Sequence, residues 1–273
     1  MITFQEITQF ERILYNNGVK LIAGIDEVGR GPLAGPFVVS AVILNLEKIF
    51  SSDIQRDVEE SRGRAVTYKN FLANKGKRGE LNTKEITRES DRNNDVPYGQ
   101  NTENESILYG KIRDSKKVTP KMRKILANFI KEQAISFQME IFEPEEIDKL
   151  GISALTQKAF SQVTNNLQIK PQFVLTDAFE VTGITKKNQK NIIKGDQKSI
   201  SIASASIVAK VFRDNIMVEL AKKYPDYGFE KNKGYGTVDH IKAIEKFGPC
   251  EIHRKSFEPI KSLFCDNKKV EKI

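Results

Sequence analysis

One short stretch constrains the fold and the chemistry of this chain more than any other. The apolar residues 21–25 lead directly into two adjacent carboxylates, Asp26 and Glu27, and a loop containing Gly29-Arg30-Gly31 follows. A carboxylate buried at the end of a core strand loses its hydration and needs a partner. A divalent metal ion is one such partner. The alternative is a strand that simply ends in a polar turn.

The loop and the net charge indicate the same class of partner. Gly29 and Gly31 carry no side chains, so the backbone there can approach another molecule closely. A metal ion beside such a loop favours a phosphate ester as substrate. The chain has 44 Lys and Arg against 36 Asp and Glu, a net charge of +8, which favours a polyanion, with nucleic acid first. A basic soluble protein without such a partner is the alternative.

The cysteines and the apolar runs indicate in which cellular compartment the protein is expected. Cys250 and Cys265 have no metal-ligand spacing and form no disulfide framework. No apolar run is long enough to span a bilayer, and the first residues lack the basic and apolar regions of a signal peptide. We therefore expect a cytoplasmic protein without a membrane partner.

Periodicity and breaker residues predict an alternation of helices and strands. Helices are expected at 3–17, 120–130, 144–148, 155–163, 200–223, 237–247 and 257–264. Strands are expected at 19–26, 37–44, 137–141, 173–177 and 191–196, and the first two form a hairpin around the glycine loop. Small residues fill the first half of the 200–223 helix, which lets it lie close to a sheet. The fold class is α/β with a mixed sheet.

The domain boundaries follow a change of composition. Residues 47–110 are polar, nearly balanced in charge and without sustained periodicity, so we expect an insertion that is largely disordered or loosely helical. A partner-binding arm is the alternative for this segment. The catalytic domain is then 1–46 with 111–248, and 249–273 forms a C-terminal helical segment and tail.

Three predicted strands end in acid. Asp26 and Glu27 end the first, Asp177 ends a later one, and Asp196 ends another. Sites collect at strand ends in α/β sheets, so these carboxylates are expected to converge and bind one or two Mg²⁺ or Mn²⁺ ions. Two such ions would activate a water and stabilise the leaving oxygen of a phosphodiester.

Other charged residues are weaker candidates for this site. Asp114 would cap a turn, and Asp214 would form a salt bridge with Arg213 or another neighbour. Lys116, Lys117 and Lys198 are candidates for phosphate contact, with simple solvation as the alternative.

Two further motifs fit a nucleic-acid partner. Tyr235 lies between two glycines beside Lys233, which suits stacking on a sugar or base. The alternative is a tyrosine that packs into the core. His253 and Arg254 would contact phosphate or hold the C-terminal segment.

Taken together, these motifs resemble bacterial ribonuclease HII, the type 2 ribonuclease H family. The matching stretches are residues 22–36, 114–117, 194–196, 203–211, 213–214, 233–237, 253–254 and 256–257. They follow the family's order and cover nearly everything outside 47–110.

The resemblance implies an RNase H-like fold, a mixed central sheet flanked by helices with a small C-terminal helical region. It implies a metal-dependent endonuclease that cuts the RNA strand of RNA–DNA hybrids and single ribonucleotides in duplex DNA, leaving 5′-phosphate and 3′-hydroxyl ends. Such an enzyme would serve ribonucleotide excision and RNA primer removal. We expect a monomer and leave a sliding-clamp partner open.

The family's functional residues fall on positions already singled out. Its catalytic, metal-binding acids fall on Asp26, Glu27, Asp177 and Asp196. Gly29, Arg30 and Gly31 would read the ribose 2′-hydroxyl, which distinguishes RNA from DNA. Tyr235 would stack on the substrate, and Ser115 and Lys116 would bind it.

The chain departs from the family in two places. Ala178 follows Asp177 where the family usually has glycine, and the 47–110 segment is much longer than the usual link. Two other functions stay open: a nucleic-acid-binding module that keeps the fold without catalysis, and a carboxylate-cluster DNA endonuclease that is specific for DNA structure.

Overall fold

The computed structural model describes residues 3–51 and 102–263 of the chain. The chain forms two compact units, and the first combines Met1–Leu46 with Ile112–Ile273. The second unit is Glu47–Lys111. Every candidate site residue named above belongs to the first unit.

Only the ends of the second unit lie within the described residues. They contain most of α3 (Leu46–Ile49) and α6 (Thr102–Tyr109). Lys48 Nζ and Glu105 Oε2 form an ion pair at 2.7 Å. The expectation of a largely disordered or loosely helical insertion concerns mainly residues 52–101, which are outside the described part, so it stays a prediction.

The first unit is built on a five-stranded mixed sheet with the strand order β3-β2-β1-β4-β5. The strands are β1 (Ile22–Val28), β2 (Phe37–Leu44), β3 (Ala134–Phe142), β4 (Phe173–Asp177) and β5 (Gln189–Ile192). β1 pairs antiparallel with β2, as the predicted hairpin requires, and β2 pairs antiparallel with β3. β4 lies parallel to both β1 and β5. The predicted mixed sheet is confirmed.

The helices follow the predicted pattern with three differences. They include α7 (Pro120–Gln133), α8 (Pro144–Leu150), α9 (Ile152–Asn165), α10 (Ile200–Lys223) and α12 (Val238–Phe247). The first predicted helix is two, α1 (Phe4–Ile7) and α2 (Gln9–Asn16), because the backbone at Thr8 (φ −100°, ψ 4°) departs from helical values. The short helix α11 (Phe229–Asn232) was not predicted, and the last predicted helix is seen only at 260–263.

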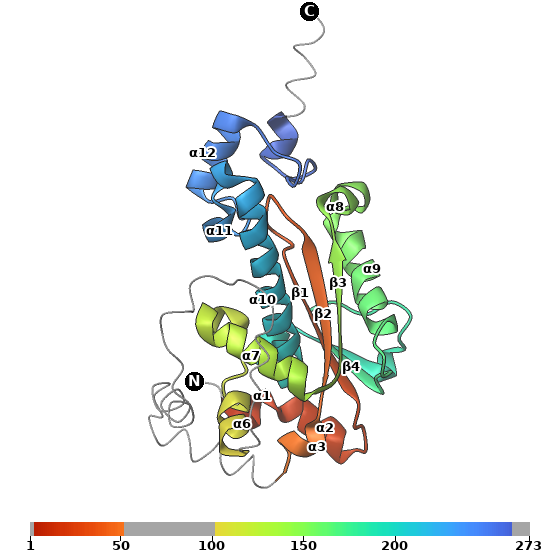
Figure 1. Cartoon of the computed structure of the whole chain (residues 1–273). Coiled ribbons are helices and arrows are strands. Elements are labelled where there is room, and N and C mark those ends of the chain that lie inside the picture. The colour runs from red at the N-terminus through yellow and green to blue at the C-terminus, as the bar shows by residue number, and fades with distance from the viewer. Residues whose placement is uncertain (1–2, 52–101, 264–273) are drawn as a thin grey trace, which may run out of the picture. The chain divides into compact units, whose positions relative to one another are not determined.

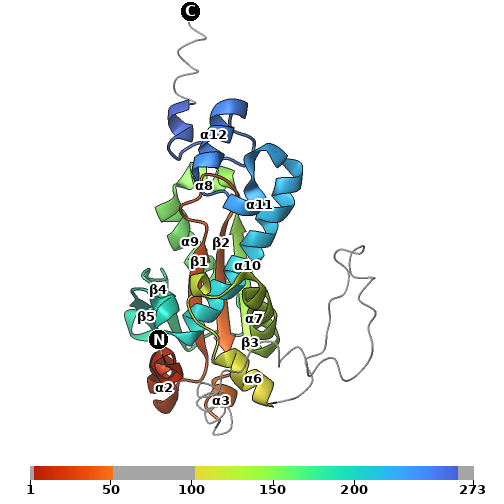
Figure 2. The same cartoon turned by 90° about the vertical axis from the view of Figure 1, so that its left-hand side faces the viewer.

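The two faces of the sheet carry different helices, as the views along and across it show (Figure 1; Figure 2). Successive side chains of a strand point to opposite faces. Ala23 and Ile25 of β1 belong to a buried apolar cluster with Leu155 and Phe160 of α9. The even-numbered side of β1 faces α10, which lies across the strand beside α7.

The contact between α10 and β1 is unusually close at Gly24. A Cβ atom on Gly24 would lie 2.0 Å from the carbonyl carbon of Ser201, so no side chain fits there. The first turns of α10 are buried and consist largely of Ala, Ser and Ile. The prediction that small residues let this helix lie close to the sheet is confirmed.

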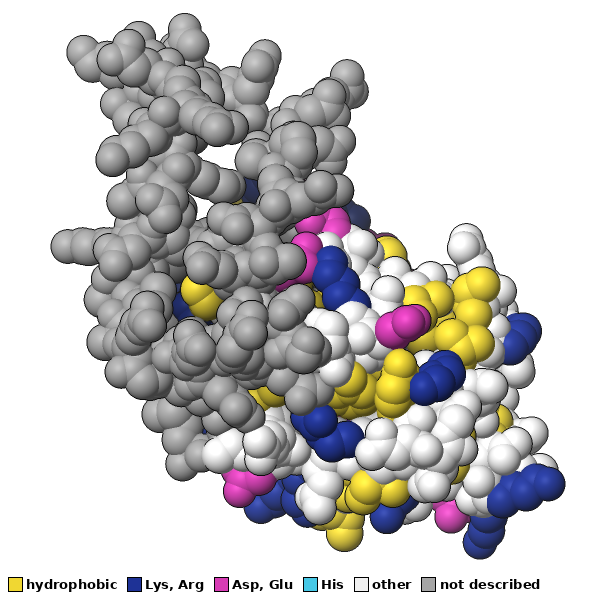
Figure 3. Space-filling model, turned by 90° about the horizontal axis from the view of Figure 1, so that it is seen from below, with side chains coloured by type: hydrophobic (Ala, Val, Ile, Leu, Met, Phe, Trp, Pro, Cys, Tyr) yellow, Lys and Arg dark blue, Asp and Glu magenta, His cyan; other side chains and the backbone are white. Residues whose placement is uncertain are grey.

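None of the helices in the described residues has the length and apolar character needed to span a membrane. Viewed from below, the coloured part of the surface mixes basic, acidic, apolar and neutral side chains, and the Lys and Arg side chains there are dispersed (Figure 3). That face therefore offers no broad basic patch among its described residues.

We predict that Gly24→Ala destabilises the protein by at least about 1–3 kcal/mol, because the new methyl group forces α10 away from β1. Urea denaturation measures the loss. Gly31→Ala is the matched control, since a Cβ there would meet nothing within 4 Å and its cost should stay within about 0.5 kcal/mol. Equal stability of the two variants would contradict this account of the packing.

Candidate active site

The four predicted acids line one pocket of about 490 Å³. The pocket is formed at the carboxyl ends of β1 and β4 with contributions from α10 and two short 3₁₀ helices, η1 (Ser115–Lys117) and η3 (Gly195–Gln197). Its lining residues are Asp26, Glu27, Val28, Ser115, Lys116, Asp177, Asp196, Ser206, Lys210 and Tyr235. Residues far apart in the sequence therefore meet at one edge of the sheet.

The parallel register of β1 and β4 explains why Asp26 and Asp177 are neighbours. Ile25 pairs with Thr176, so the next residue of each strand is a carboxylate. The prediction that Asp196 ends a strand is wrong: β5 ends at Ile192 and Asp196 lies in η3, where the chain turns toward α10. The Gly195 amide donates to Asp177 Oδ1 at 3.0 Å and ties η3 to the end of β4.

Asp26 and Glu27 have different surroundings because adjacent strand residues point to opposite faces. Asp26 is buried and hydrogen-bonded to Ser206 of α10. Glu27 Oε1 lies 3.9 Å from Arg30 Nη1, while Glu27 Oε2 is buried with no hydrogen-bond partner. Arg30 Nη1 also donates to Thr156 Oγ1 of α9 at 3.0 Å.

Burial and repulsion between carboxylates raise the pKa values of Asp26, Glu27 and Asp196. Burial, and then the charge of Glu27, hold the pKa of Asp26 well above its ordinary value. Burial raises the pKa of Glu27 to about 7, although the charge of Arg30 opposes the shift. Burial and the charges of Asp114 and Asp177 raise the pKa of Asp196 to about 6. These groups lack enough positive charge nearby to stabilise their ionised forms.

This environment fits a divalent cation. In the described ranges 3–51 and 102–263, no three His, Cys, Asp or Glu side chains are grouped tightly enough to enclose one ion as they stand. The donors are nevertheless all carboxylates, the ligands that Mg²⁺ and Mn²⁺ prefer. The unpartnered Glu27 Oε2 is a buried acceptor that a cation would satisfy.

Some of the residues predicted to bind substrate line the pocket, and others do not. Ser115 is buried, and its Oγ accepts a hydrogen bond from Ser206 Oγ at 3.1 Å, while Lys116 lines the pocket. Tyr235 lines the pocket with 42% of its surface exposed, so it is not a core residue. Lys117 and Lys198 are not among the lining residues.

Ser206 and Lys210 line the pocket although the sequence analysis did not select them. They are four residues apart on α10, which places them on one face of the helix. That spacing after the small-residue run is the signal that would have found them. Lys210 Nζ lies 2.7 Å from Asp214 Oδ1, so Asp214 pairs with this neighbour rather than with Arg213.

The two glycines beside Arg30 have different physical roles. Gly29 has a φ of +92°, and a Cβ there would lie 2.5 Å from Arg213 Nε, so the fold itself requires glycine. Gly31 is exposed and open on its Cβ side. Only Gly31 leaves free space toward an approaching molecule. Arg254 is fully buried and holds the backbone of this loop, which excludes the predicted alternative of phosphate contact.

Comparison with known sequences identifies the family of this chain. A sequence model described as Ribonuclease HII matches residues 98–260. The chain is 37% identical to the ribonuclease HII of Chlamydia abortus over 262 residues, covering 96% of this chain and 95% of the relative. It is 41% identical to the ribonuclease HII of Clostridium beijerinckii over 238 residues, which cover 87% of this chain and 67% of the relative. The chain belongs to the ribonuclease HII family. It is therefore a ribonuclease H, a hydrolase of phosphodiester bonds.

Solved structures show the same fold at lower identity. The ribonuclease H2 of Pyrococcus horikoshii aligns with a TM-score of 0.60 and 21% identity, covering 92% of this chain and 99% of the other. The PCNA:RNase HII complex of Archaeoglobus fulgidus has a TM-score of 0.55 and 18% identity, covering 87% and 95%. Bst-RNase HIII in complex with Mn²⁺ has a TM-score of 0.50 and 15% identity, covering 91% and 70%. The RNase H-like fold is confirmed.

The departure at Ala178 from the usual ribonuclease HII pattern has a backbone consequence. Ala178 has a φ of +62°, a left-handed conformation that glycine adopts without penalty. In alanine it costs about 1–2 kcal/mol. Asp177 nevertheless lines the pocket beside Asp26, so the substitution does not displace this acid from the site.

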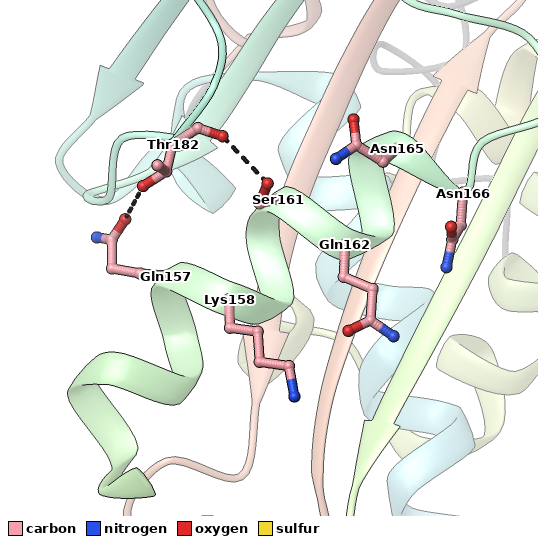
Figure 4. Close-up of a pocket in the computed structure, with 7 residues that line it drawn as sticks. All are labelled: Gln157, Lys158, Ser161, Gln162, Asn165, Asn166 and Thr182. Carbon is pink, nitrogen blue, oxygen red and sulfur yellow. Dashed lines mark hydrogen bonds between the residues drawn. The ribbon is translucent and has the colours of Figure 1, made fainter.

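A second pocket of about 580 Å³ lies on the other side of this ribonuclease HII chain, along α9 (Figure 4). Its lining is mostly amide and hydroxyl groups, and several of them bond to one another or to Glu140. Among the described residues that line this pocket, Lys158 is the one with a charge, and none of them is a carboxylate. Of these two pockets, the carboxylate pocket is the one whose lining could hold a divalent ion.

The raised pKa of Glu27 predicts how the stability of this ribonuclease HII depends on pH without divalent ions. The folded protein holds the Glu27 proton up to about pH 7, whereas the unfolded chain loses it near the ordinary value of 4.5. The folded state therefore binds more protons between these values, and the free energy of unfolding falls as the pH rises through that window. Glu27→Gln cannot ionise and should flatten this fall.

Urea denaturation in chelator at about pH 5 and about pH 8 measures the effect. Glu245→Gln, which removes an exposed carboxylate, is the control and should follow the unchanged protein. Parallel pH profiles for Glu27→Gln and the unchanged protein would contradict the raised pKa. Added Mg²⁺ should recover stability at the higher pH, because a cation favours the ionised form.

Proposed function

We propose that this protein is a metal-dependent endoribonuclease that cuts the RNA strand of RNA–DNA hybrids and single ribonucleotides within duplex DNA. The observation that supports this best is one pocket that combines four carboxylates with Lys116, Lys210 and a half-exposed Tyr235. The family membership supports the RNA strand as the target. The products would carry 5′-phosphate and 3′-hydroxyl ends, and the cellular role would be ribonucleotide excision and RNA primer removal.

Asp26, Glu27, Asp177 and Asp196 would hold Mg²⁺ or Mn²⁺. Such ions supply an activated water and stabilise the charge on the leaving oxygen. The Mn²⁺ complex of Bst-RNase HIII supports a divalent ion in a protein of this fold. The raised pKa values of Asp26, Glu27 and Asp196 also support this assignment, since buried acids that repel each other gain most from a cation.

The remaining pocket residues would bind and orient the substrate. Lys116 and Lys210 bring positive charge to the pocket, which suits the scissile phosphate and its neighbours. Tyr235 offers a ring for stacking on a sugar or base. Ser206 bonds to both Asp26 and Ser115 and would hold these two groups in fixed positions.

We extend the proposal to setting and partners. The enzyme would act in the cytoplasm as a monomer. A sliding clamp is a candidate partner, because one protein of the same fold was solved in a PCNA:RNase HII complex.

Asp26→Asn should lower cleavage of a duplex with one ribonucleotide by at least about a hundredfold while hybrid binding stays measurable, because the amide loses the charge that holds the metal. A gel-based assay with Mg²⁺ and with Mn²⁺ measures the rate of cleavage, and fluorescence anisotropy measures hybrid binding. Asp226→Asn changes an exposed acid in the same way and should keep full activity. Full activity in Asp26→Asn would remove the proposed site.

The same assay separates the alternatives. A binding module without catalysis would show no metal-dependent cleavage in the unchanged protein. A DNA endonuclease of the carboxylate-cluster type would cut an all-DNA duplex or branched DNA as well as the duplex with one ribonucleotide. Cleavage only beside the ribonucleotide supports the proposed function.

Tyr235→Ala should raise KM for a duplex with one ribonucleotide, because stacking of a base on an aromatic ring contributes about 1–3 kcal/mol. That corresponds to roughly a five- to hundredfold weaker interaction. Tyr235→Phe keeps the ring and should stay close to the unchanged enzyme. Unchanged KM in Tyr235→Ala would exclude the stacking role.

A further inference from the structure

Arg254 is a fully buried arginine whose donors are all directed at the glycine loop. Its Nη2 donates to the Gly29 oxygen at 2.7 Å, and its Nη1 donates to the Arg30 oxygen at 3.1 Å. Nε and Nη2 bind the Gly35 oxygen at 3.1 and 2.9 Å. One side chain therefore collects the carbonyl groups at both ends of the loop.

The chain holds this arginine from two further sides. The Arg254 amide donates to the Leu33 oxygen at 2.8 Å, and His253 forms a β-bridge with Ala34. The guanidinium also lies 5.1 Å from the centre of the Phe257 ring. No carboxylate in the described residues lies within ion-pair distance of Arg254, so loop carbonyls replace the anion that usually accompanies a buried arginine.

Because the carbonyl groups of the loop are held by Arg254, the geometry of the peptide bond determines where the neighbouring amide groups point. The peptides of this loop are trans, so each N–H points away from the C=O of the same peptide. With the Gly29 and Arg30 carbonyls held inward, the amide N–H groups of Arg30 and Gly31 point outward. Neither amide has an acceptor in the part of the chain that the structure describes. Gly31 is exposed and has open space on its Cβ side.

We propose that Arg254 is a positioning residue for substrate recognition: it holds two consecutive loop carbonyls inward so that two adjacent amide N–H groups present a fixed pair of donors to a ribonucleotide. This inference rests on the proposed function. Arg254 itself never touches the substrate. Lysine could not replace it, because one ammonium cannot reach carbonyls on both sides of the loop.

A second buried arginine provides a matched control. Arg213 is also fully buried, and its guanidinium donates to the oxygens of Pro36, Ala34 and Lys233 at 2.8, 3.1 and 2.9 Å. It binds neither the Gly29 nor the Arg30 carbonyl. Arg213→Lys therefore removes a comparable set of buried hydrogen bonds and leaves the two recognition peptides with their partner.

The test measures binding in the non-cleaving Asp26→Asn protein. Dissociation constants are determined by anisotropy for a duplex with one ribonucleotide and for the same duplex made of DNA only, and their ratio reports the preference for RNA. Adding Arg254→Lys should reduce this ratio about tenfold, because two donors lose their orientation. Adding Arg213→Lys should keep the ratio, while both arginine variants lose thermal stability.

A ratio that Arg254→Lys leaves unchanged would overturn the inference while the proposed function stands. Equal losses of preference in both arginine variants would also overturn it, since that indicates a general loosening of the loop. Absence of any preference in the Asp26→Asn parent would overturn the inference, because the amide pair then does not discriminate RNA from DNA, while the cleavage assay decides the proposed function separately.

Should Arg254→Lys fail to fold, the unmutated arginine still allows a test. The amide proton resonances of Arg30 and Gly31 are followed by NMR in the Asp26→Asn protein as each duplex is added. Downfield shifts of both amides with the ribonucleotide duplex, and smaller ones with the DNA duplex, are expected. Amides that respond equally to both duplexes would refute the proposal.

Discussion

The close packing of α10 on β1 is the constraint on which the site depends. Gly24 allows the backbone of Ser201 to approach the strand at a distance that excludes any side chain. Two residues further along β1 on the same face, Asp26 reaches Ser206 of the same helix. The spacing between helix and strand thus sets the position of the most buried of the four pocket acids. A larger residue at Gly24 would change the fold and the pocket together.

The electrostatics of the pocket oppose the stability of the protein. Four acids face one cavity, and burial with repulsion between carboxylates raises the pKa values of Asp26, Glu27 and Asp196. Folding tolerates this arrangement because the surrounding structure is held by other contacts, such as the Gly195 amide on Asp177. Perturbed titration in a cleft is characteristic of functional sites.

The glycine loop between β1 and β2 is held by hydrogen bonds from two fully buried arginines. Arg213 and Arg254 direct their donors at its carbonyls, and the C-terminal segment pairs with it through Ala34 and His253. The Gly234 carbonyl accepts from the Leu33 amide at 2.8 Å, which connects the loop to the segment that carries Tyr235. The glycine loop and the segment that carries Tyr235 therefore belong to one hydrogen-bonded assembly.

Local sequence patterns were sufficient for most elements and for the acids. The residues of β2, β4 and α10 agree with their predicted bounds because apolar runs, β-branched residues and caps act over a few positions. Asp196 was assigned to a strand that ends four residues earlier, since the turn of η3 depends on a long-range bond to Asp177. Ser206 and Lys210 were missed because they join the pocket only through the packing of α10.

The sequence by itself was enough to select the candidate site residues, since carboxylates, a glycine-arginine-glycine loop and an aromatic between glycines are recognisable without contacts. Tertiary structure decided what each of them does in the fold. Gly29 is required by its positive φ and by Arg213, whereas Gly31 is open to an approaching molecule. Arg254 binds the loop and not a phosphate. These roles depend on neighbours more than a hundred residues away in the chain, which no local pattern can specify.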